Sequence, residues 1–485
     1  MKLVFKIFAS LVLALIAIVL FQTLNFENPE SYSPATAKKV TAYPKVLAEA
    51  LRFETISHKP GMIDDSTFLK FHDFLKESFP LVHSKLKLEK INKYSLMYYW
   101  KGSNSTLDPL VIMAHQDVVP ADYSTLSQWH YPPFAGNIVD GFIYGRGSLD
   151  DKGSMISILN AAEELLAENF QPSKTIIFCF GHDEEIGGDN GAKEMAKILE
   201  KRGIKAFMVL DEGGNIVKGI VPGIESPVAL IGTSEKGYVS LEFTVETAGG
   251  HSSMPNKKTA IAVLTDALYH LKENPMPNRI SDPLKGFISS IGPELPFVQK
   301  MAFANTWLFR PIIFDVYEES ASGTALIRTT QTTTIFQSGI KDNVIPNRAK
   351  AVVNFRLLPG DEPEEILRRA REIVSDSLVK IKIFESFSIP ASPISEYKTQ
   401  EFRSLGNTIK GVFPNVIVSP YLVIGATDAR YFYSISDCVY RFSPIVLEKE
   451  DLPRLHGINE RISVDGFENS VNFYATFLYN LTRKN

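Results

Sequence analysis

The sequence predicts an α/β fold with a mainly parallel sheet and a smaller inserted α+β module. Three observations predict it. Apolar runs typical of strands alternate with runs typical of helices along the first half of the chain. Acidic residues and histidines follow several of the strand-like runs, at the place where open α/β sheets bind ligands. The hydropathy pattern then changes near residue 237 and indicates an antiparallel sheet with two helices on one face.

Composition places the 485 residues among folded globular chains, because 45% are hydrophobic and 22% are charged. The net charge of -4 provides no basic field for phosphates, so we expect no nucleic-acid partner. The two cysteines, Cys179 and Cys438, lie in apolar runs and are too few for a disulfide framework. We interpret both as buried thiols.

The N-terminal segment 1–25 is long and apolar enough to cross a bilayer. Lys2 and Lys6 precede an uncharged run at 7–24, which is about the length of a membrane-spanning helix. Small residues suited to signal cleavage are absent just after this run, which favours an uncleaved signal-anchor over a cleaved signal peptide. The lysines place the N-terminus in the cytoplasm. We therefore expect a membrane-anchored protein with its remaining residues in a lumen or extracytoplasmic space or, after cleavage, a secreted one.

The segment 26–44 contains turn formers without apolar periodicity and is predicted to be a tether. The catalytic domain is expected to begin at residue 45, and its first part, 45–236, shows the alternation of strands and helices. Its runs follow in the order strand, helix, strand, helix, strand at 108–117, 154–170, 174–181, 192–203 and 205–214.

The segment 237–394 is predicted to be an inserted module with the order β-α-β-β-α-β, which is typical of a ferredoxin-like unit. Its runs lie at 238–248, 259–273, 326–336, 349–358, 362–377 and 379–385. The stretch 275–325 does not fit this unit and is predicted to be an insertion without assigned structure. The second part of the catalytic domain, 395–485, returns to the α/β pattern with a helix, a strand and a terminal helix.

Residues with metal-binding chemistry are concentrated in five short segments. Four of these segments follow a strand-like run and precede glycine or a turn, so their side chains are expected to converge on one edge of the sheet. The segments are VIMAHQDVVP with His115 and Asp117, GRGSLDDKG with Asp150 and Asp151, GHDEEIGG with Glu184 and Glu185, VLDEGG with Asp211 and Glu212, and RLHGINERI with His456.

Two imidazoles and several carboxylates form a ligand set suited to zinc or a similar divalent ion. Without a cation, so many neighbouring carboxylates would repel one another. Because zinc needs about four ligands, the set is large enough for two ions if one carboxylate bridges them. For any single acid, a turn cap or a surface ion pair would be the simpler interpretation, but the five segments together favour metal binding.

The five segments resemble the di-zinc aminoacylase and carboxypeptidase family of metallopeptidases. The order H-x-D, D-D-K, E-E, D/E and a distant C-terminal H is similar to the order in that family, from about residue 45 to the end. HQDVVP, GRGSLDDKG, GHDEEIGG and the apolar N-terminus most resemble its carboxypeptidase S branch, which includes N-fatty-acyl-amino-acid synthase/hydrolases. The resemblance implies two zinc ions per subunit, with cobalt or manganese as substitutes.

The same resemblance implies a role for each matching residue. The implied metal ligands are His115, Asp150, Glu185, Asp211 and His456, with Asp150 as the bridge. Glu184 is implied as the general base, which takes a proton from water and delivers it to the leaving amine. Asp117 lies two residues after His115, on the same side of a strand, and would orient its imidazole. Asp211 is preferred to Glu212, although both are competent oxygen donors.

Residues that contact substrate are also implied by the resemblance. His251 in GGHSS resembles a lid histidine that polarises the scissile carbonyl, often in a partner subunit, so a homodimer through the inserted module is expected. Asn343 and Arg356 match positions that bind the substrate's carboxylate, which arginine suits by its bidentate geometry. The segment GATDAR matches the substrate cleft through Gly425, Thr427 and Arg430. Taken alone, His251 and Asn343 would be turn residues, and Arg356 would be a strand-edge residue.

The sequence therefore favours a di-zinc metallohydrolase whose amine product is an amino acid with a free carboxylate. Its expected substrate is an N-acyl amino acid or a short peptide cut at its C-terminus. The branch also implies the reverse reaction, in which a fatty acid condenses with an amino acid. One alternative is a dipeptidase or aminopeptidase that requires a free amine. A second alternative, a metal-free binding module, would need the loss of a ligand or of Glu184, and neither is lost.

Overall fold

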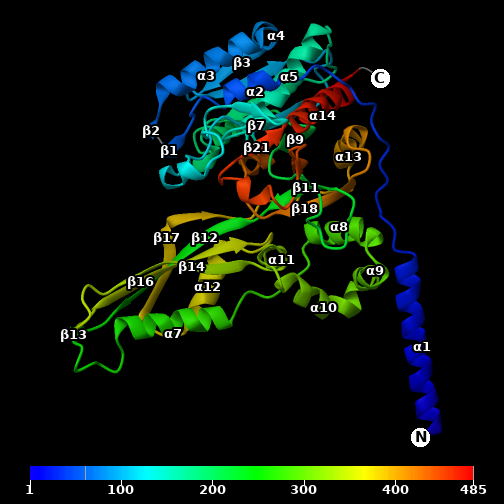
Figure 1. Cartoon of the computed structure of the whole chain (residues 1–485). Coiled ribbons are helices and arrows are strands. Elements are labelled where there is room, and N and C mark those ends of the chain that lie inside the picture. Colours follow the sequence, from blue (N-terminus) through cyan, green and yellow to red (C-terminus); the bar gives the residue numbers. More distant parts are fainter. Residues whose placement is uncertain (60–61, 484–485) are drawn as a thin grey trace.

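The computed structural model describes residues 1–59 and 62–483 (Figure 1). A large central sheet is formed by β3 (Lys87–Ile91), β4 (Ser95–Trp100), β5 (Leu110–His115), β8 (Ile176–Gly181), β9 (Met208–Asp211), β10 (Ile216–Val217), β11 (Val228–Glu235), β18 (Ile417–Val423), β19 (Val439–Arg441) and β20 (Val446–Leu447). Its strand order is β20-β10-β11-β19-β9-β5-β8-β4-β3, with β18 beside β11. A short hairpin outside this sheet is formed by β1 (Ser57–Lys59) and β2 (Met62–Ile63).

The large sheet is mixed, whereas the sequence predicted a mainly parallel one. β5 pairs in parallel with β8 and with β9, and β9 pairs in parallel with β19. However, β3 and β4 form an antiparallel pair, as do β10 and β11. The reason is that consecutive strands joined by a short connection pair antiparallel, because a parallel pair needs a crossover helix between its strands. The α/β architecture itself is confirmed.

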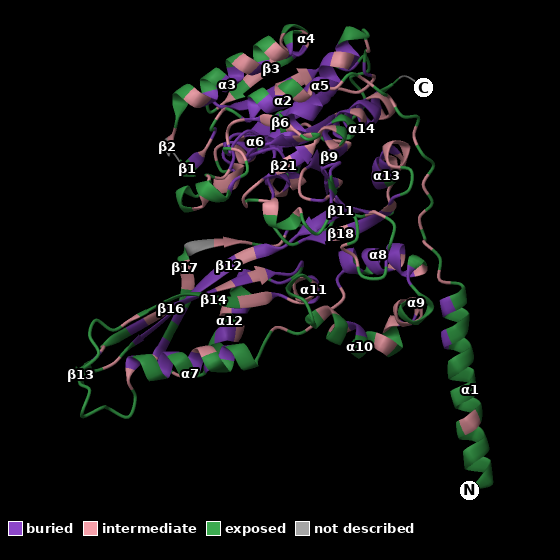
Figure 2. Ribbon diagram, in the orientation of Figure 1, coloured by how far each residue is buried: buried purple, intermediate pink, exposed green. Residues whose placement is uncertain are grey.

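Helices cover both faces of the large sheet (Figure 2). β8 shows why its apolar run is continuous: Ile176 and Phe178 pack toward one helical layer, and Ile177 and Cys179 pack toward the other. Cys438, interpreted as buried, is only half-buried. On the first face lie α2 (Pro44–Ala50), α3 (Asp65–Ser78), α4 (Pro80–Lys85), α5 (Lys152–Ala167), α13 (Gln400–Val412) and α14 (Val464–Thr482), and on the second lies α6 (Ala192–Lys201).

A second, antiparallel sheet carries two helices and extends away from the first (Figure 1). Its elements are, in chain order, β12 (Gly237–Glu246), α7 (Ala260–Glu273), β14 (Thr330–Ser338), β16 (Arg348–Leu357), α12 (Pro363–Val374) and β17 (Val379–Ile389). The strand order is β14-β16-β12-β17. Alternate residues of β12, such as Leu241 and Phe243, share a core with α7 and α12. At the far tip of this module, β13 (Gly250–His251) pairs with β15 (Val344–Ile345).

The stretch 275–325, for which the sequence assigned no structure, is mainly helical. It contains α8 (Asp282–Ile291), α9 (Phe297–Ala304), α10 (Thr306–Glu318) and most of α11 (Ala321–Ile327). Leu284, Phe287 and Ile291 of α8 share a core with Val228 and Leu230 of β11. These helices therefore extend the fold beside the large sheet instead of extending the inserted sheet.

The N-terminal helix α1 (Lys2–Leu24) is long and apolar enough to cross a membrane, by length and composition, and most of it is exposed. The segment after it, predicted to be a tether, lies along α13 and α14. The backbone N–H groups of Lys38 and Val40 donate to Thr476 Oγ1 at 2.9 Å and Asn472 Oδ1 at 3.0 Å. An extended segment must satisfy its backbone N–H groups, and the polar side chains of α14 do so here.

Candidate metal centre

Acidic and histidine side chains gather where parallel strands end. His115 is the last residue of β5, and Asp211 is the last residue of β9. Glu184 and Glu185 lie directly after β8, in the short 3-10 turn η2 (Glu184–Ile186). Because β5 has β8 and β9 as its parallel neighbours, the C-terminal ends of the three strands share one edge of the sheet. This edge therefore holds residues from three of the five segments.

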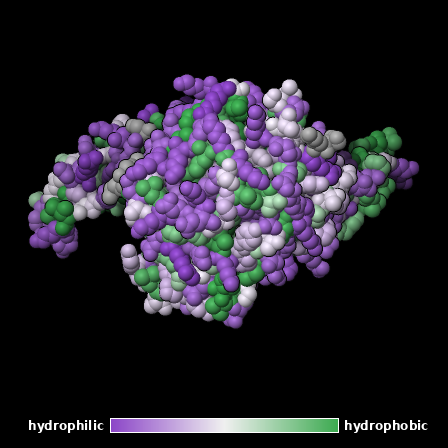
Figure 3. Space-filling model, turned by 90° about the horizontal axis from the view of Figure 1, so that it is seen from above, coloured by the Kyte–Doolittle hydropathy of each residue, from purple (hydrophilic) through white to green (hydrophobic). Residues whose placement is uncertain are grey.

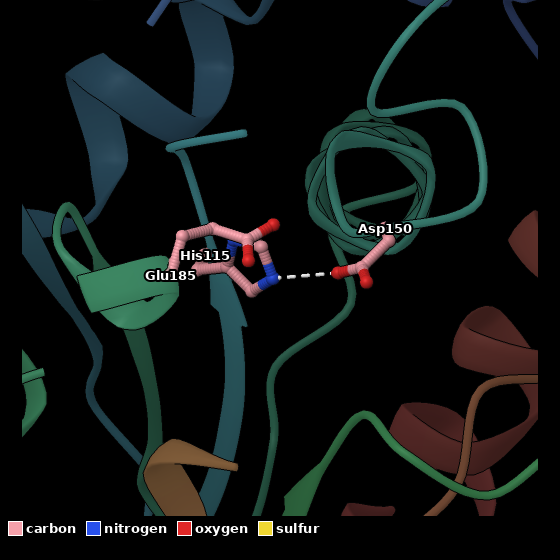
Figure 4. A group of neighbouring side chains, drawn as sticks. All are labelled: His115, Asp150 and Glu185. Atoms are coloured by element: carbon pink, nitrogen blue, oxygen red, sulfur yellow. Dashed lines mark hydrogen bonds and ion pairs between the residues drawn. The ribbon is translucent and has the colours of Figure 1, made fainter. Parts of the chain in front are cut away.

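Asp150, in the loop before α5, lies opposite His115 (Figure 4). Its Oδ1 lies 2.8 Å from His115 Nε2, and its Oδ2 lies 3.0 Å from His456 Nε2. His456 Nε2 also lies 3.5 Å from Glu185 Oε2. The ligand atoms of His115, Asp150 and Glu185 all lie within 4.8 Å of one another. One carboxylate thus faces two imidazoles, which is an arrangement suited to a bridging ligand.

The protein itself supplies too little positive charge for the acids of this cluster. Burial raises the pKa of Glu184 well above its ordinary value, and neighbouring carboxylates add to the rise. Burial and nearby carboxylates do the same to the pKa of Glu212. Among the residues that the structure describes, Glu185 Oε1 is buried without a hydrogen-bond partner. Converging nitrogen and oxygen donors with a surplus of buried carboxylates fit a divalent cation.

Asp117, predicted to orient His115, makes a different set of hydrogen bonds. His115 Nδ1 lies 2.9 Å from the backbone carbonyl oxygen of Asp117 and 3.6 Å from its carboxylate Oδ1. The carboxylate of Asp117 accepts hydrogen bonds from the backbone N–H groups of Glu184 at 3.1 Å and Glu185 at 3.2 Å. Asp117 therefore fixes the imidazole through its main chain and the turn that carries both glutamates through its side chain.

Asp211 and Glu212, the two adjacent candidates for one ligand position, have different surroundings. Asp211 is buried, and its Oδ2 accepts a hydrogen bond of 2.7 Å from the backbone N–H of Ala429. Glu212 lines a cavity of about 370 Å³ together with Asp150 and His456. Glu212 thus lines the same cavity as Asp150 and His456, whereas Asp211 is buried at the end of β9.

A buried ion pair joins the loop of Asp150 to the loop of His456, and the sequence reasoning missed it. Arg146 Nη1 lies 2.5 Å from Glu460 Oε2, and Arg146 Nη2 donates to the carbonyl oxygen of His456 at 3.1 Å. Glu460 Oε1 accepts from the backbone N–H groups of Gly147 at 2.9 Å and Leu149 at 2.8 Å. The available signal was that both residues lie inside the segments GRGSLDDKG and RLHGINERI. A small sheet brings these segments together, through β6 (Asn137–Val139), β7 (Phe142–Tyr144) and β21 (Arg461–Ser463).

His72, which has no motif around it, belongs to a buried network beside the cluster. Its Nε2 lies 2.9 Å from Gln116 Oε1, and its Nδ1 lies 3.2 Å from Lys90 Nζ. Burial lowers the pKa of His72 from 6.5 to about 4, and the charge of Lys90 adds to this effect. A neutral imidazole that donates to Gln116 and accepts from Lys90 satisfies all three groups.

We expect His72→Gln to flatten the pH dependence of stability. His72 is neutral in both states above its ordinary pKa of 6.5, so it has no effect there. Between pH 6.5 and about pH 4 only the unfolded chain takes up the proton, so this histidine removes up to about 3 kcal/mol of stability as the pH falls. Urea unfolding of both proteins at several pH values would measure the difference in slope. A control, His130→Gln at an exposed histidine, should follow the wild type, and equal slopes for all three would contradict the expectation.

The structure places the residues implied to contact substrate in three separate regions. His251 and Asn343 are exposed at the far tip of the inserted module, where the carbonyl of Asn343 accepts from the backbone N–H of Ser252 at 3.2 Å. Figure 1 shows this tip remote from the strand ends that carry the acidic cluster. Arg356 lies on β16 with its guanidinium 5.0 Å from the ring centroid of Tyr238. A single chain therefore does not bring these residues to the cluster.

The segment GATDAR lies much closer to the cluster. Gly425 and Thr427 line the cavity of Asp150. Thr427 donates through its N–H and its hydroxyl to Glu235 Oε2, at 2.7 and 3.1 Å. Arg430 Nη2 donates to the carbonyl of Gly187 at 2.7 Å, so it supports the turn after the glutamate pair.

Side chains that can bind a metal ion lie at the strand ends of an α/β sheet, with a further acid beside them. This arrangement is typical of α/β metallohydrolases. Comparison with known proteins gives the particular family. The chain belongs to peptidase family M20/M25/M40, which matches residues 111–480. The resemblance found in the sequence is thereby confirmed, and the protein belongs to a family of hydrolases.

Relatives extend over nearly the whole chain. The protein is 39% identical to the probable carboxypeptidase S-like 2 of Dictyostelium discoideum, over 98% of this chain and 93% of that protein. It is 38% identical to the N-fatty-acyl-amino acid synthase/hydrolase PM20D1 of Bos taurus, over 94% of this chain and 91% of that protein. The M20 family metallo-carboxypeptidase Sso-CP2 of Sulfolobus solfataricus has the same fold, with a TM-score of 0.65 at 21% identity, covering 90% of this chain and 98% of that one.

Proposed function

We propose that the protein is a di-zinc hydrolase that releases an amino acid from an N-acyl amino acid or from the C-terminus of a short peptide. The observation that carries this proposal is the cluster of His115, Asp150, Glu185 and His456, with Glu184 beside it. The names of two relatives, a carboxypeptidase S-like protein and an N-fatty-acyl-amino acid synthase/hydrolase, support the two substrate classes.

Two cations would be held by the two histidines, by Glu185, by Asp150 between them, and by one acid of the Asp211 and Glu212 pair. Asp211 is the preferred acid for that position, because a carboxylate whose one oxygen accepts from Ala429 can still offer the other to a cation. Glu212, which lines the cavity of Asp150, is the second candidate. When bound, zinc ions supply Lewis-acid chemistry that polarises a carbonyl and lowers the pKa of water. The crowding of buried carboxylates supports such an occupant.

Glu184 is the residue that moves the proton in this proposal. Asp117 accepts a hydrogen bond from the backbone N–H of Glu184. The turn, and not a metal, therefore positions the carboxylate of Glu184. This carboxylate takes the proton of the attacking water and delivers it to the leaving nitrogen as the C–N bond breaks.

The cavity beside Asp150 favours a blocked, apolar acyl group over a free amine. Its lining includes the apolar residues Val217, Leu230, Val423, Ile424, Leu447 and Leu455. Among the described residues that line it, the acids are Asp150 and Glu212, and both belong to the candidate metal ligands. A substrate ammonium group would therefore find no further carboxylate there, whereas an acyl chain would bury apolar surface.

The inserted module would act as a lid and dimerisation unit, with boundaries at 237–394. Because His251 belongs to β13, at the tip of this module, we propose that it reaches the active site of a second copy, where its imidazole would polarise the scissile carbonyl. Arg356 and Asn343 would bind the substrate carboxylate in that closed assembly. The helix α1 would serve as a signal-anchor that keeps residues 45–236 and 395–485 on the extracytoplasmic side. Condensation of a fatty acid with an amino acid is the reverse of the same reaction.

A comparison of three substrates tests this function. The full chain with zinc would be assayed for amino-acid release from a long-chain N-acyl-phenylalanine, a blocked dipeptide and the same dipeptide with a free amine. We expect release from both blocked substrates, fastest from the N-acyl amino acid, and loss of this activity with a chelator. Cleavage of the free-amine dipeptide alone would replace the proposal with a dipeptidase, and activity that survives removal of all metal would contradict the metal assignment.

A further inference from the structure

An apolar face on α9 and α10 is left uncovered by the described parts of the chain. In α10, Leu308, Ile312 and Val316 recur every fourth residue and so lie along one side of the helix. They are 39%, 56% and 57% exposed, and Trp307 beside them is 54% exposed. The α9–α10 apolar face consists of these and two exposed residues of α9: Phe297, Val298, Trp307, Leu308, Ile312 and Val316.

The last turns of α1 contact α9 and α10 directly. Asn305, between α9 and α10, is buried, and its Nδ2 donates to Thr23 Oγ1 at 3.2 Å and to the carbonyl oxygen of Val19 at 3.3 Å. Trp307 Nε1 donates to Gln22 Oε1 at 3.0 Å. The α9–α10 apolar face thus begins at the level of residues 19–23 of α1. Figure 1 shows α10 at the edge of its helical group on the side toward which α1 projects.

The length of α1 decides where a bilayer surface would lie. The uncharged run 7–24 is about 27 Å long as a helix, and the hydrocarbon core of a bilayer is about 30 Å thick. If the core ended before Val19, whose carbonyl oxygen accepts from Asn305, only about 18 Å of helix would remain inside it. The whole run, including Gln22 and Thr23, must therefore reach the outer boundary of the core, at the position of α9 and α10.

Resting on the signal-anchor role proposed for α1, we propose that the α9–α10 apolar face docks on the surface of the same bilayer, with Trp307 among the lipid headgroups. Tryptophan is enriched at this level of a membrane because its ring is apolar and its N–H is polar. Arg310, exposed on α10, would reach lipid phosphates. Asp315 is also exposed on α10, but it directly precedes Val316 and therefore lies off the line formed by Leu308, Ile312 and Val316.

A bilayer accounts for the two uncovered apolar surfaces together. The side chains of α1 are almost all exposed, and Figure 3 shows strongly hydrophobic atoms gathered at the end of the molecule where α1 projects. The α9–α10 apolar face adjoins this helix without a gap, because Asn305 and Trp307 contact it. Because the two surfaces adjoin, one lipid surface covers both.

Quenching of Trp307 by brominated lipid tests the proposal. The chain has three tryptophans, and Trp100 and Trp129 are only 4% and 9% exposed. The full chain would be placed in phosphatidylcholine vesicles whose acyl chains carry bromine near the headgroups, and its emission compared with that in unbrominated vesicles. We expect the wild type to lose roughly a third of its emission, the share of one tryptophan in three, and Trp307→Phe to lose almost none.

Two double variants provide the control. Leu308→Glu with Ile312→Glu should reduce the quenching of Trp307 at least twofold, because the face no longer enters the lipid. Ile261→Glu with Tyr269→Glu, at exposed apolar positions of α7, should leave the quenching unchanged. Two results would overturn the proposal. The first is equal emission in both kinds of vesicle from a chain that resists alkaline extraction. The second is removal of the chain from the vesicles by alkaline extraction. A dimer in detergent that the Leu308→Glu, Ile312→Glu variant abolishes would assign the face to a second copy instead.

Discussion

Replacing Glu184 by glutamine is expected to lower kcat for amide hydrolysis by about 10²–10⁴-fold while the bound metal stays in place. Glutamine keeps the size and the polarity of the side chain, but it cannot accept the proton of water and return it to the leaving nitrogen. The turn itself should not move, because Asp117 holds the backbone N–H of residue 184 and not its side chain. Turnover of an N-acyl amino acid and metal content per chain are the two measurements.

Glu185→Gln is the matched control for this expectation. Glu185 is adjacent in the same turn, yet its Oε2 lies 3.5 Å from His456 Nε2, within the ligand cluster. This variant should therefore lose both metal and activity, whereas the Glu184 variant loses activity alone. If the Glu184 variant also lost metal, Glu184 would be a ligand, and the assignment of the general base would be wrong.

The variant Glu460→Gln is expected to lose both stability and metal affinity. Glu460 is fully buried and pairs with Arg146, so a neutral side chain leaves a buried guanidinium without its counter-ion. Breaking such a pair costs about 3–5 kcal/mol. The same carboxylate holds the backbone of the Asp150 loop, and loss of a residue that orients ligands lowers metal affinity by about 10–100-fold. Urea unfolding of the metal-free chain and a zinc titration would measure the two effects separately.

A double variant separates the two roles of this ion pair. Arg146→Met combined with Glu460→Leu removes both charges, and replacing a buried pair by apolar residues is often neutral for stability. We expect the double variant to recover most of the lost stability and none of the lost zinc affinity, because the hydrogen bonds of Arg146 and Glu460 that hold the backbone of the two loops are then lost. Recovery of zinc affinity together with stability would show that the pair supports the fold without positioning the ligands.

Much of the candidate site could be predicted because its residues lie in short sequence segments that can be recognised without the fold. His115, Asp150 and Glu185 each lie in a short segment after a strand or before a helix, and strand ends are where such a sheet binds ligands. The contact between Asp150 and His456 was not predictable from spacing, since the two residues are 306 positions apart. Only the resemblance to a family joined them, and it did so without a geometry.

The local sequence pattern does not distinguish Asp211 from Glu212 as the ligand. Adjacent residues at the end of a strand point to opposite sides. Which side faces the candidate metal cluster depends on how β9 lies between β5 and β19, and these pairings involve strands far away in the chain. The backbone N–H that donates to Asp211 belongs to Ala429, in a segment more than 200 positions later. No periodicity within VLDEGG carries that information.

The sequence by itself determined the α/β class, the inserted strands and helices, the apolar N-terminal helix and the residue types of a metal centre, because each depends on local periodicity or local chemistry. The tertiary structure alone decided the mixed character of the large sheet and the helices of 275–325. It alone also revealed the Arg146 and Glu460 pair, the partners of Asp211 and the contact of α1 with α10. These features arise from contacts between distant segments, and such contacts form only when the whole chain packs.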